Sequence, residues 1–450
     1  MNNSVKNLKK GYDIRLKGAA EQKYLNVSQP NLFALKPTDF IGIAPIPKLK
    51  VKEGEEVKAG EALFFDKPSP EIIYSAPVSG EIVEVRRGAK RAITEIIILA
   101  DSEVKFHEFG KMDPGAASRE DIVNRLLASG AWVLMRQRPY NVVPKPTDVP
   151  RDIFVSCFDT APLAADQNFL MQGKEQHFQA GLKVLSKLTT GSVHLGVTST
   201  SAEVFKRAEG AKVHGFKGPH PAGNVGVHIH HAAPISKGEI VWTIKPQDVA
   251  IIGKLFSEGI YDAERTIAIA GDELKETGYF KTRVGANIKP LVEGNLQQDN
   301  VRYISGNVLS GTRINADGFM GIFDDLLTVI EEGNKHEFLG WLFPSYPRPS
   351  LSRTFPSFLF PNREYHVNSN NHGEERAFVM SGQYERVMPM DVYPQHLIKS
   401  IMYQDFDQME GLGIYEVVEE DLALCEFVCT SKQPVQKILR EGLDLMRIEG

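Results

Sequence analysis

The sequence predicts a multidomain protein of the α+β class. Its 450 residues exceed what one hydrophobic core usually organises, so several domains are expected. Short β-rich runs separated by glycine turns fill residues 39–101, a strand–helix–strand pattern spans residues 153–197, and helices dominate after Val392. The changes in pattern place domains at 1–104, 105–260, 261–335 and 336–450.

The composition is that of an ordinary soluble protein, with 42% hydrophobic and 24% charged residues. A net charge of -5 and the lack of a Lys/Arg-rich block argue against nucleic acid as a partner. The longest apolar run, Ile96–Ala100, is far shorter than the roughly 18 residues of a membrane helix. The opening residues, MNNSVKNLKKGYDI, contain no apolar core for a signal peptide. Three cysteines are too few for a disulfide framework, so we expect a cytoplasmic protein.

The first domain is predicted to be a small β domain built from hairpins. The segments VKEGEEVKAG (51–60) and APVSG (76–80) resemble the biotinyl/lipoyl carrier domain, which implies a barrel-sandwich hybrid. A carrier lysine would stand between methionines at a hairpin tip, whereas the tip here reads FFDKPSPE. A modified Lys67 is therefore the minor alternative. We favour a solvated lysine on a scaffold without a swinging arm.

The second domain is predicted to be a parallel α/β unit that follows a short helix at Ala117–Ser129. The apolar runs Ile153–Cys157 and Val193–Val197 are typical of strands, and Gly173–Leu188 between them has helical spacing of apolar residues. A strand, a helix and a parallel strand imply a Rossmann-like α/β domain. No G-x-G-x-x-G follows the first strand, so a tightly bound dinucleotide is not expected. Cys157, at the end of that strand, is interpreted as a buried structural thiol rather than a reactive one.

The remaining chain is predicted to form a β-grasp module and a helical domain. Strands alternate with glycine turns from Thr266, which suits a β-grasp module. Residues 342–361 form a proline-rich loop region. A further strand is expected at Ile240–Ile244. Helices are expected at Asp248–Ser257, Asp324–Glu332, Pro394–Tyr403 and Val435–Arg447.

The segment Gly215–Pro234 reads GFKGPHPAGNVGVHIHHAAP and is predicted to be neither an ordinary helix nor an ordinary strand. It holds four glycines and four histidines. Glycines allow a backbone to approach a flat ligand closely, and histidines supply donors, acceptors and titratable rings. We give equal weight to two interpretations of this segment. It is either a binding loop or a rigid crossover between domains, whose histidines have structural hydrogen-bond partners.

The order of these parts resembles the A subunit of the bacterial Na⁺-translocating NADH:quinone oxidoreductase (NQR), nearly from end to end. The resemblance rests on KKGYDIRLKG (Lys9–Gly18), GPHPAGNVGVHIHHAAP (Gly218–Pro234), EFLGWLFP (Glu337–Pro344) and GQYERVMPMDVYP (Gly382–Pro394). The family implies a carrier-like barrel, a Rossmann-like domain, a β-grasp (soluble-ligand-binding, SLBB) module and a C-terminal helical domain. It also implies a peripheral subunit on the cytoplasmic side of the bacterial inner membrane, without covalent flavin, that docks on membrane subunits and is associated with quinone.

The C-terminal domain has a second resemblance, to electron-transport subunits with two C-x-x-C-x-x-C-x-x-x-C-P repeats that hold iron–sulfur clusters. The corresponding positions here are Phe378, Ser381, Tyr384 and Met388, and then Glu419, Leu422, Cys425 and Cys429. Two thiols of eight remain, so no cluster is expected. Cysteines four residues apart on a helix would share a face. We interpret Cys425 and Cys429 as a structural relic of degenerate cluster positions rather than a weak metal site.

Quinone binding is the function that these observations leave for the chain itself. A quinone head group needs close-packed walls and one or two hydrogen-bond donors. The candidate quinone-binding residues are His220, Gly223, Gly226, His228 and His230. In an extended segment, His228 and His230 would point the same way. A metal site of His214 with His220, His228 and His230 is the minor alternative, because no carboxylate or cysteine stands at a supporting spacing.

The partners implied are the other NQR subunits, including its membrane subunits, and a quinone such as ubiquinone. The chain alone is not expected to oxidise NADH or to conduct sodium ions, because it has no dinucleotide fingerprint and no membrane span. A purely structural scaffold is the alternative role. Aromatic residues of the late loop are expected to cap a pocket or to contact a partner. They are Trp341, Phe343, Tyr346, Phe355 and Phe358.

Overall fold

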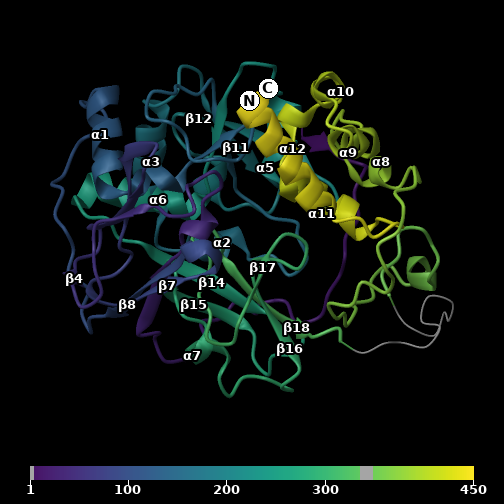
Figure 1. The fold of residues 1–450 in the computed structure, drawn as a ribbon, viewed down its shortest axis with the longest axis horizontal. Coiled ribbons are helices and arrows are strands. Elements are labelled where there is room, and N and C mark those ends of the chain that lie inside the picture. The colour runs from purple at the N-terminus through teal and green to yellow at the C-terminus, as the bar shows by residue number, and fades with distance from the viewer. Residues whose placement is uncertain (1–4, 335–347) are drawn as a thin grey trace.

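The computed structural model describes residues 5–334 and 348–450. Figure 1 shows the N-terminal β domain at the left, the α/β domain in the upper middle, the β-grasp module below it and the C-terminal helices at the upper right. The segment EFLGWLFP and the aromatic residues Trp341, Phe343 and Tyr346 lie outside the described residues. Short 3-10 helices lie at Pro37–Asp39, Ala89–Arg91, Ala131–Leu134, Pro356–Leu359 and Ile414–Glu416.

The N-terminal β domain is the predicted barrel-sandwich hybrid. One of its sheets has the order β2 (Leu32–Leu35), β8 (Ile93–Ala100), β7 (Gly80–Arg87) and β4 (Glu56–Val57). The other has the order β3 (Lys48–Leu49), β5 (Ala62–Asp66) and β6 (Ser69–Ser75). Every neighbouring pair is antiparallel, and alternate side chains from both sheets fill the core. Lys67 lies in the exposed turn between β5 and β6, at the predicted hairpin tip.

The second domain contains the predicted parallel α/β sheet. Its strands, in spatial order, are β1 (Lys6–Asn7), β12 (Ala211–Lys217), β11 (Val193–Val197), β10 (Ile153–Ser156), β13 (Val241–Thr243) and β9 (Arg136–Arg138). All neighbours are parallel except β13 and β9. The chain therefore moves from β10 outward through β11 and β12, and then returns to the other side of β10. The N-terminal strand β1 belongs to this sheet rather than to the barrel that follows it in sequence.

The helices of this domain are α1 (Arg119–Ser129), α2 (Gln167–Leu170), α3 (Glu175–Ser186), α4 (Glu203–Lys206), α5 (Val225–Ala232) and α6 (Pro246–Glu258). They lie on both faces of the sheet, except α1, which packs against β6 of the N-terminal domain. The pair α3 and α6 packs backbone to backbone because both helices carry glycine at the contact. A Cβ on Gly253 would lie 1.7 Å from the carbonyl oxygen of His177, and one on Gly181 would lie 2.0 Å from that of Val249. The helices predicted around residues 117–129, 173–188 and 248–257 are confirmed.

The prediction for Gly215–Pro234 is wrong over most of that segment. Its first residues extend β12, and Val225–Ala232 form helix α5, with Asn224 as the N-cap. Side chains of residues that are two apart on a helix point in nearly opposite directions, because each residue rotates about the helix axis by about 100°. His228 and His230 therefore do not point the same way.

The third domain is a β-grasp module with one short helix, α7 (Lys289–Val292). Its strand order is β15 (Gly278–Arg283), β14 (Glu264–Ala270), β18 (Leu326–Glu331), β16 (Val301–Ser305) and β17 (Thr312–Ile314). The helix predicted at Asp324–Glu332 is wrong, because most of that segment forms the central strand β18. Strand β18 pairs parallel with β14 and antiparallel with β16, and burial of both its faces removes the polar alternation that would have marked a strand.

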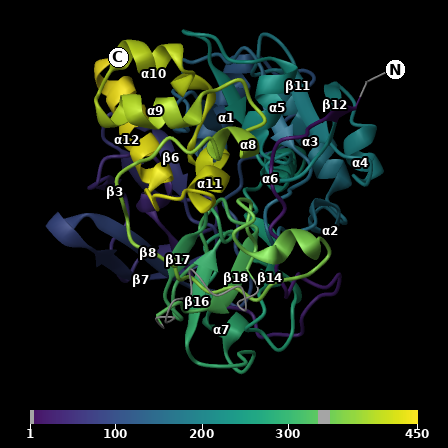
Figure 2. The ribbon, with the colours of Figure 1, turned by 90° about the vertical axis from the view of Figure 1, so that its right-hand side faces the viewer.

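The C-terminal domain is helical, as predicted (Figure 2). Its helices are α8 (Tyr384–Val387), α9 (Pro394–Met402), α10 (Phe406–Gly411), α11 (Glu419–Phe427) and α12 (Val435–Glu449). Their apolar faces form one core that also contains Leu8, Ile14 and Leu16 from the N-terminal segment. None of the helices within 5–334 and 348–450 is long and apolar enough to cross a membrane.

Candidate functional site

A cleft of about 580 Å³ opens at the carboxyl ends of β10 and β13. Ser156 and Phe158 line it from the first strand, and Thr243 and Lys245 line it from the second. From β10 the chain continues to β11 on one side of it, and after β12 and α5 it returns to β13 on the other side. In open α/β sheets, such a switch point is where the loops diverge and ligands bind. The fold therefore places a binding cleft where this architecture generally has one.

The other domains complete the walls of this cleft. The β-grasp module contributes residues within 306–312 and 321–326, and the helical domain contributes Glu419 and Glu420 from α11. Asp39, which ends the first 3-10 turn of the N-terminal domain, also lines it. All four domains meet here, so the cleft has its shape only in the assembled chain.

Two of the predicted site residues, His220 and Gly223, line this cleft. The Gly223 N–H donates to the Thr160 hydroxyl at 2.9 Å, and that hydroxyl lies 3.1 Å from His220 Nδ1. Burial lowers the pKa of His220, against the opposing effect of Asp159, so the ring is neutral near pH 7. In the tautomer whose Nδ1 accepts the Thr160 hydroxyl proton, the ring proton lies on Nε2. That nitrogen has no hydrogen-bond partner among the described residues and is available to a ligand.

His228 lies outside the cleft, in the core beneath α5. Its ring stacks on Phe216, with centroids 4.2 Å apart, and on Phe158 at 5.3 Å. The Nε2–H group donates to the carbonyl oxygen of Ala222 at 2.8 Å, which fixes the tautomer. Burial lowers the pKa of His228 to about 3. The ring is thus a neutral packing element that supports the cleft wall formed by Phe158.

His230 also lies outside the cleft and ties α5 to the helical domain. Its Nδ1–H donates to Glu416 at 2.8 Å, and its Nε2 accepts the backbone N–H of Asp391 at 3.1 Å. The neighbouring His231 donates from Nε2 to the carbonyl oxygen of Pro389 at 2.8 Å. The contacts of His230 and His231 agree with a crossover that joins domains. The positions of His220 and Gly223 in the cleft wall agree with a binding loop.

Gly226 allows α5 to approach the first turn of α11. A Cβ at this position would lie 2.4 Å from the carboxylate of Asp421. Asp421 accepts from Arg138 at 2.6 Å, and both side chains are at most 1% exposed. The other terminal nitrogen of Arg138 donates to Glu420 at 2.6 Å. No pattern in the sequence indicated this pair, since 283 positions separate Arg138 from Asp421.

An unpaired cation lies in the cleft wall. The Arg136 guanidinium stands over the Phe323 ring, 3.6 Å from its centroid, and both residues line the cleft. Arg136 forms no ion pair with any residue that the structure describes, and burial lowers its pKa. A ligand with electron-rich oxygen atoms would complement this group.

A buried carboxyl group lies beside this cation. Asp248, in the first turn of α6, lines the cleft and pairs with Arg265, which also donates to Asp325 at 2.9 Å. Burial raises the pKa of Asp248 to about 6 despite the Arg265 charge, and its Oδ2 atom has no hydrogen-bond partner among the described residues. Lys245 lies 3.3 Å from Asp325, and its side chain remains 46% exposed. Asp248 was not predicted from the sequence, although its position just after a parallel strand was a usable signal.

The four histidines of the alternative metal site do not converge. His214 Nε2 lies 2.9 Å from His194 Nδ1, with the two rings stacked. His220, His228 and His230 have the separate partners described above. Nothing in the described residues supports a metal ion bound by this set.

Cys425 and Cys429 are buried in the core of the helical domain. Helix α11 ends at Phe427, so Cys429 lies beyond it and the predicted shared helix face is wrong. The Cys429 sulfur accepts the backbone N–H of Gln433 at 3.4 Å, and burial raises the pKa of Cys425. Of the other degenerate positions, Leu422, Tyr384 and Met388 belong to the same apolar core. Cys157 is buried as predicted.

Comparison with known proteins identifies the family. Family profiles match residues 6–101 (NqrA N-terminal barrel-sandwich hybrid domain), 117–261 (NqrA second alpha/beta domain) and 266–316 (NQRA C-terminal domain, of SLBB type). The A subunit of the Na(+)-translocating NADH-quinone reductase of Yersinia pestis bv. Antiqua (strain Angola) is 38% identical over 448 residues, which cover 98% of this chain and 99% of the relative. Its counterpart in Rhodopirellula baltica is 38% identical over 453 residues, 99% of each chain.

Among solved structures, an air-oxidized NAD+-reducing [NiFe]-hydrogenase matches 77% of this chain and 67% of its own. The TM-score is 0.37 and the sequence identity is 10%, which is too low to support any argument. The family profiles and the full-length relatives agree with each other and with the domain order. The chain therefore belongs to the NqrA family, the A subunits of the Na(+)-translocating NADH-quinone reductase, an oxidoreductase complex.

Proposed function

We propose that this subunit binds quinone in the cleft at the carboxyl ends of β10 and β13, and so supports electron transfer from NADH to quinone coupled to Na⁺ export. The observation that carries the proposal is the neutral His220 ring, which lines this cleft and whose Nε2 atom has no partner among the described residues. A quinone carbonyl oxygen needs a donor of this kind. Membership in the reductase complex supplies the substrate class.

The other walls of the cleft suit the same ligand. Phe158 and Phe323 offer apolar surface, and the Lys245 ammonium and the Arg136 guanidinium offer charge to the second carbonyl oxygen. Reduction of a quinone to a quinol consumes two protons. Asp248, whose pKa burial raises to about 6, lines the cleft and is a group that could relay protons to the quinone oxygen atoms near neutral pH.

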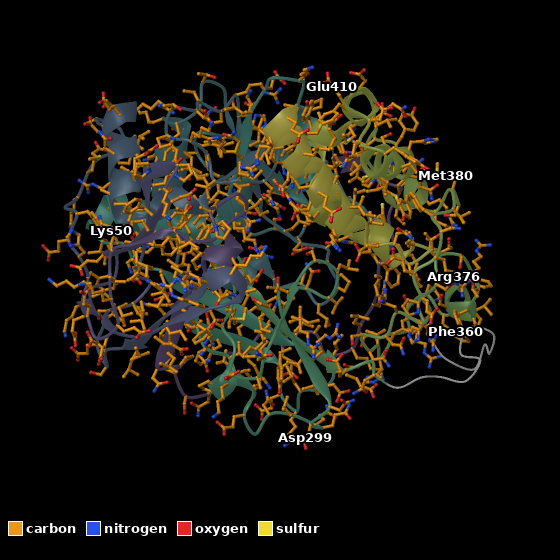
Figure 3. The ribbon with its side chains drawn as sticks, viewed as in Figure 1. Lys50, Asp299, Phe360, Arg376, Met380 and Glu410 are labelled. Carbon is orange, nitrogen blue, oxygen red and sulfur yellow. The ribbon has the colours of Figure 1, made fainter. Side chains whose placement is uncertain are left out.

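The subunit docks, in this proposal, on membrane subunits at the cytoplasmic side of the bacterial inner membrane. Several apolar side chains between residues 358 and 380 are exposed: Phe358 is 51% exposed, Leu359 62%, Phe360 54% and Val379 59%. Figure 3 shows Phe360 and Met380 on the same margin of the molecule. Such a surface on one chain is typical of contact with a partner.

No flavin and no iron–sulfur cluster are part of this proposal. Six of the eight cluster positions lack a thiol, and the buried ones among them fill an apolar core. Electrons would therefore reach the bound quinone from other subunits of the complex.

Isothermal titration of the full chain with a short-chain ubiquinone tests the proposal. We expect saturable binding that His220→Ala weakens by about threefold to tenfold, the value of one hydrogen bond. His230→Gln is the matched control, because His230 lies on the same segment but outside the cleft, and it should leave the affinity unchanged. Equal affinities for the wild type and both variants would place the ligand elsewhere.

The alternative is a purely structural scaffold. The contacts of His230 and His231 with the helical domain favour it, since they join domains without requiring a ligand. This alternative predicts no saturable heat of binding in the same titration, whereas the proposal requires it.

A further inference from the structure

Residues 11–13 of the N-terminal segment lie against the loop that carries His220. They belong to the sequence KKGYDIRLKG, which has no part in the quinone site described above. The preceding strand β1 pairs with β12 at the edge of the α/β sheet, and the N–H of Leu8 extends this ladder by donating to the carbonyl oxygen of Lys217 at 2.7 Å. The pairing brings the N-terminal segment beside residues 218–224, which follow β12.

The backbone of His220 is bound on both sides by this segment. Its N–H donates to Asp13 Oδ1 at 2.8 Å, and its carbonyl oxygen accepts the N–H of Tyr12 at 2.8 Å. A peptide unit is planar, so the two units that flank the His220 Cα together determine the direction of its Cα–Cβ bond. The N-terminal segment therefore fixes the direction in which the imidazole leaves the backbone.

The Thr160 hydroxyl restricts the remaining freedom of the His220 side chain. It lies 3.1 Å from His220 Nδ1 and is itself held by the N–H of Gly223 at 2.9 Å. The backbone and one ring nitrogen of His220 are thus both held before any ligand arrives. A ligand that accepts a hydrogen bond from Nε2 does not have to order this side chain, which reduces the entropic cost of binding.

Gly11 makes the close approach of the two segments possible. Its φ of +137° is a conformation that residues with a Cβ rarely adopt. A Cβ here would lie 2.2 Å from the carbonyl oxygen of His220 and 2.9 Å from Cγ of Pro219. The N–H of Gly11 donates to the carbonyl oxygen of Arg386 at 3.1 Å, in α8 of the helical domain. The position of His220 thus depends on the helical domain as well as on the α/β domain.

We propose that Asp13 and Gly11 are positioning residues for His220 and thereby set the affinity of the cleft for quinone. This inference rests on the proposed quinone site. Neither residue is among those that line the cleft, so their effect on a bound quinone passes through His220. Asp13 is exposed, so its replacement leaves the core of the protein intact.

A double-mutant cycle, measured by isothermal titration of the full chain with a short-chain ubiquinone, tests this coupling. Asp13→Ala should weaken binding by about threefold to tenfold, the value of one hydrogen bond, because the His220 ring is no longer held in place. The double variant should bind no more weakly than His220→Ala alone, since Asp13 acts through that ring. Asp13→Asn keeps an oxygen acceptor and should recover most of the affinity that Asp13→Ala loses.

Hydrogen exchange gives a second measurement, which needs no ligand. Asp13→Ala should speed exchange in residues 218–224, because the N–H of His220 loses its acceptor. Gly11→Ala should speed it further, because the new methyl group displaces the carbonyl oxygen of His220. The melting temperature of Asp13→Ala should stay close to that of the wild type, so that weaker binding cannot be ascribed to misfolding.

Two variants serve as matched controls. Asp113, like Asp13, is exposed and accepts a backbone N–H, at 2.9 Å, but it lies away from this loop. Gly54, like Gly11, has a positive φ, of +84°, but it has open space where a Cβ would be. Asp113→Ala and Gly54→Ala should therefore change neither exchange in residues 218–224 nor the affinity for ubiquinone.

The proposal is overturned if Asp13→Ala leaves exchange in residues 218–224 at the rate of the wild type. It is also overturned if Asp13→Ala weakens binding as much in the His220→Ala background as in the wild type, because Asp13 would then act without that ring. If the wild type binds no quinone, the proposed function fails, and exchange alone decides whether Asp13 and Gly11 position His220.

Discussion

Arg138 and Asp421 form an ion pair with 2.6 Å between Nη1 and Oδ2, in a site from which solvent is almost wholly excluded. Arg138 ends β9 of the α/β domain, and Asp421 lies in the first turn of α11 in the helical domain. Asp421 also accepts the backbone N–H of Val418 at 3.0 Å, so it caps the helix as well. The pair joins the two domains next to the proposed quinone cleft.

Replacement of Asp421 by Asn should destabilise the chain by about 3 kcal/mol, because it removes the buried counterion of Arg138 and leaves the guanidinium paired with Glu420 alone. Glu410→Gln is the matched control. It breaks the pair of Lys237 with Glu410, which links the same two domains but is exposed, and should cost less than about 1 kcal/mol. The measurement is the free energy of urea-induced unfolding. Equal losses of unfolding free energy in the two variants would mean that the buried pair of Arg138 and Asp421 contributes no more to stability than the exposed pair.

Gly226→Ala tests how closely α5 and α11 approach. The new methyl group would lie 2.4 Å from Asp421, so we expect a loss of about 1–3 kcal/mol. Gly411 also lies in a helix, α10, but has open space where a Cβ would be. Gly411→Ala should therefore be neutral or slightly stabilising. The measurement is the melting temperature of both variants. If Gly226→Ala were as stable as Gly411→Ala, the close approach of α5 to Asp421 would be contradicted.

The buried His228 ring should make stability depend on pH. The unfolded chain takes up a proton at this residue near pH 6.5, whereas the folded chain resists protonation until about pH 3. Stability is thus fully present above pH 6.5 and falls as the pH drops toward 3, by up to about 1.4 kcal/mol per pH unit from this group. His228→Gln, followed by urea unfolding between pH 7 and pH 4.5, should show a shallower decline. Identical slopes would show that His228 is protonated in the folded chain.

The three cysteines should be protected from thiol reagents. Cys157, Cys425 and Cys429 are all buried, and burial raises the pKa of Cys157 and Cys425, which lowers the fraction of reactive thiolate. We expect Ellman's reagent to react at least about tenfold more slowly with the native chain than with the chain in guanidinium, where three thiols should react. Rapid reaction of Cys425 or Cys429 in the native state would contradict the relic interpretation, and rapid reaction of Cys157 would contradict its structural role.

Local patterns in the sequence were sufficient for most of the architecture. The helical spacing of Gly173–Leu188 and the apolar strands on either side of it predicted the parallel α/β unit, because those elements bury one face or both in a single core. The two misassigned segments failed for different reasons. Glycines and histidines masked helix α5, although Asn224 before an apolar stretch was an available N-cap signal. Strand β18 is buried on both faces, so periodicity could not distinguish it from a helix, although its β-branched residues Thr328, Val329 and Ile330 favoured a strand.

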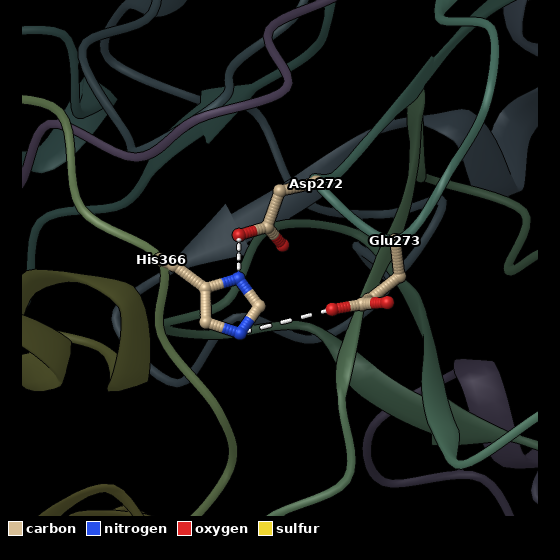
Figure 4. A group of neighbouring side chains, drawn as sticks. All are labelled: Asp272, Glu273 and His366. Carbon is tan, nitrogen blue, oxygen red and sulfur yellow. Dashed lines mark hydrogen bonds and ion pairs between the residues drawn. The ribbon is translucent and has the colours of Figure 1, made fainter. Parts of the chain in front are cut away.

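The candidate site was less predictable than the fold. His220 and Gly223 were found because one glycine-rich segment happened to contain them, and His230 came from the same segment but lies elsewhere. Arg136 and Asp248 reach the cleft only through the sheet topology and the packing of domains. His366 is hydrogen-bonded to Asp272 (Figure 4), 94 positions away, because the residues around His366 pair with Leu16 and with the end of β18. No local pattern reports such distant contacts.

Photolabelling of the full chain with an azidoquinone, followed by mass spectrometric mapping of the labelled residues, is the sharpest test of the proposed quinone site. We expect labels within residues 156–161, 219–225 and 243–248, which line the cleft or adjoin it, and we expect excess ubiquinone to remove them. Labels confined to other parts of the chain, or labels that ubiquinone does not displace, would contradict a quinone site at the carboxyl ends of β10 and β13.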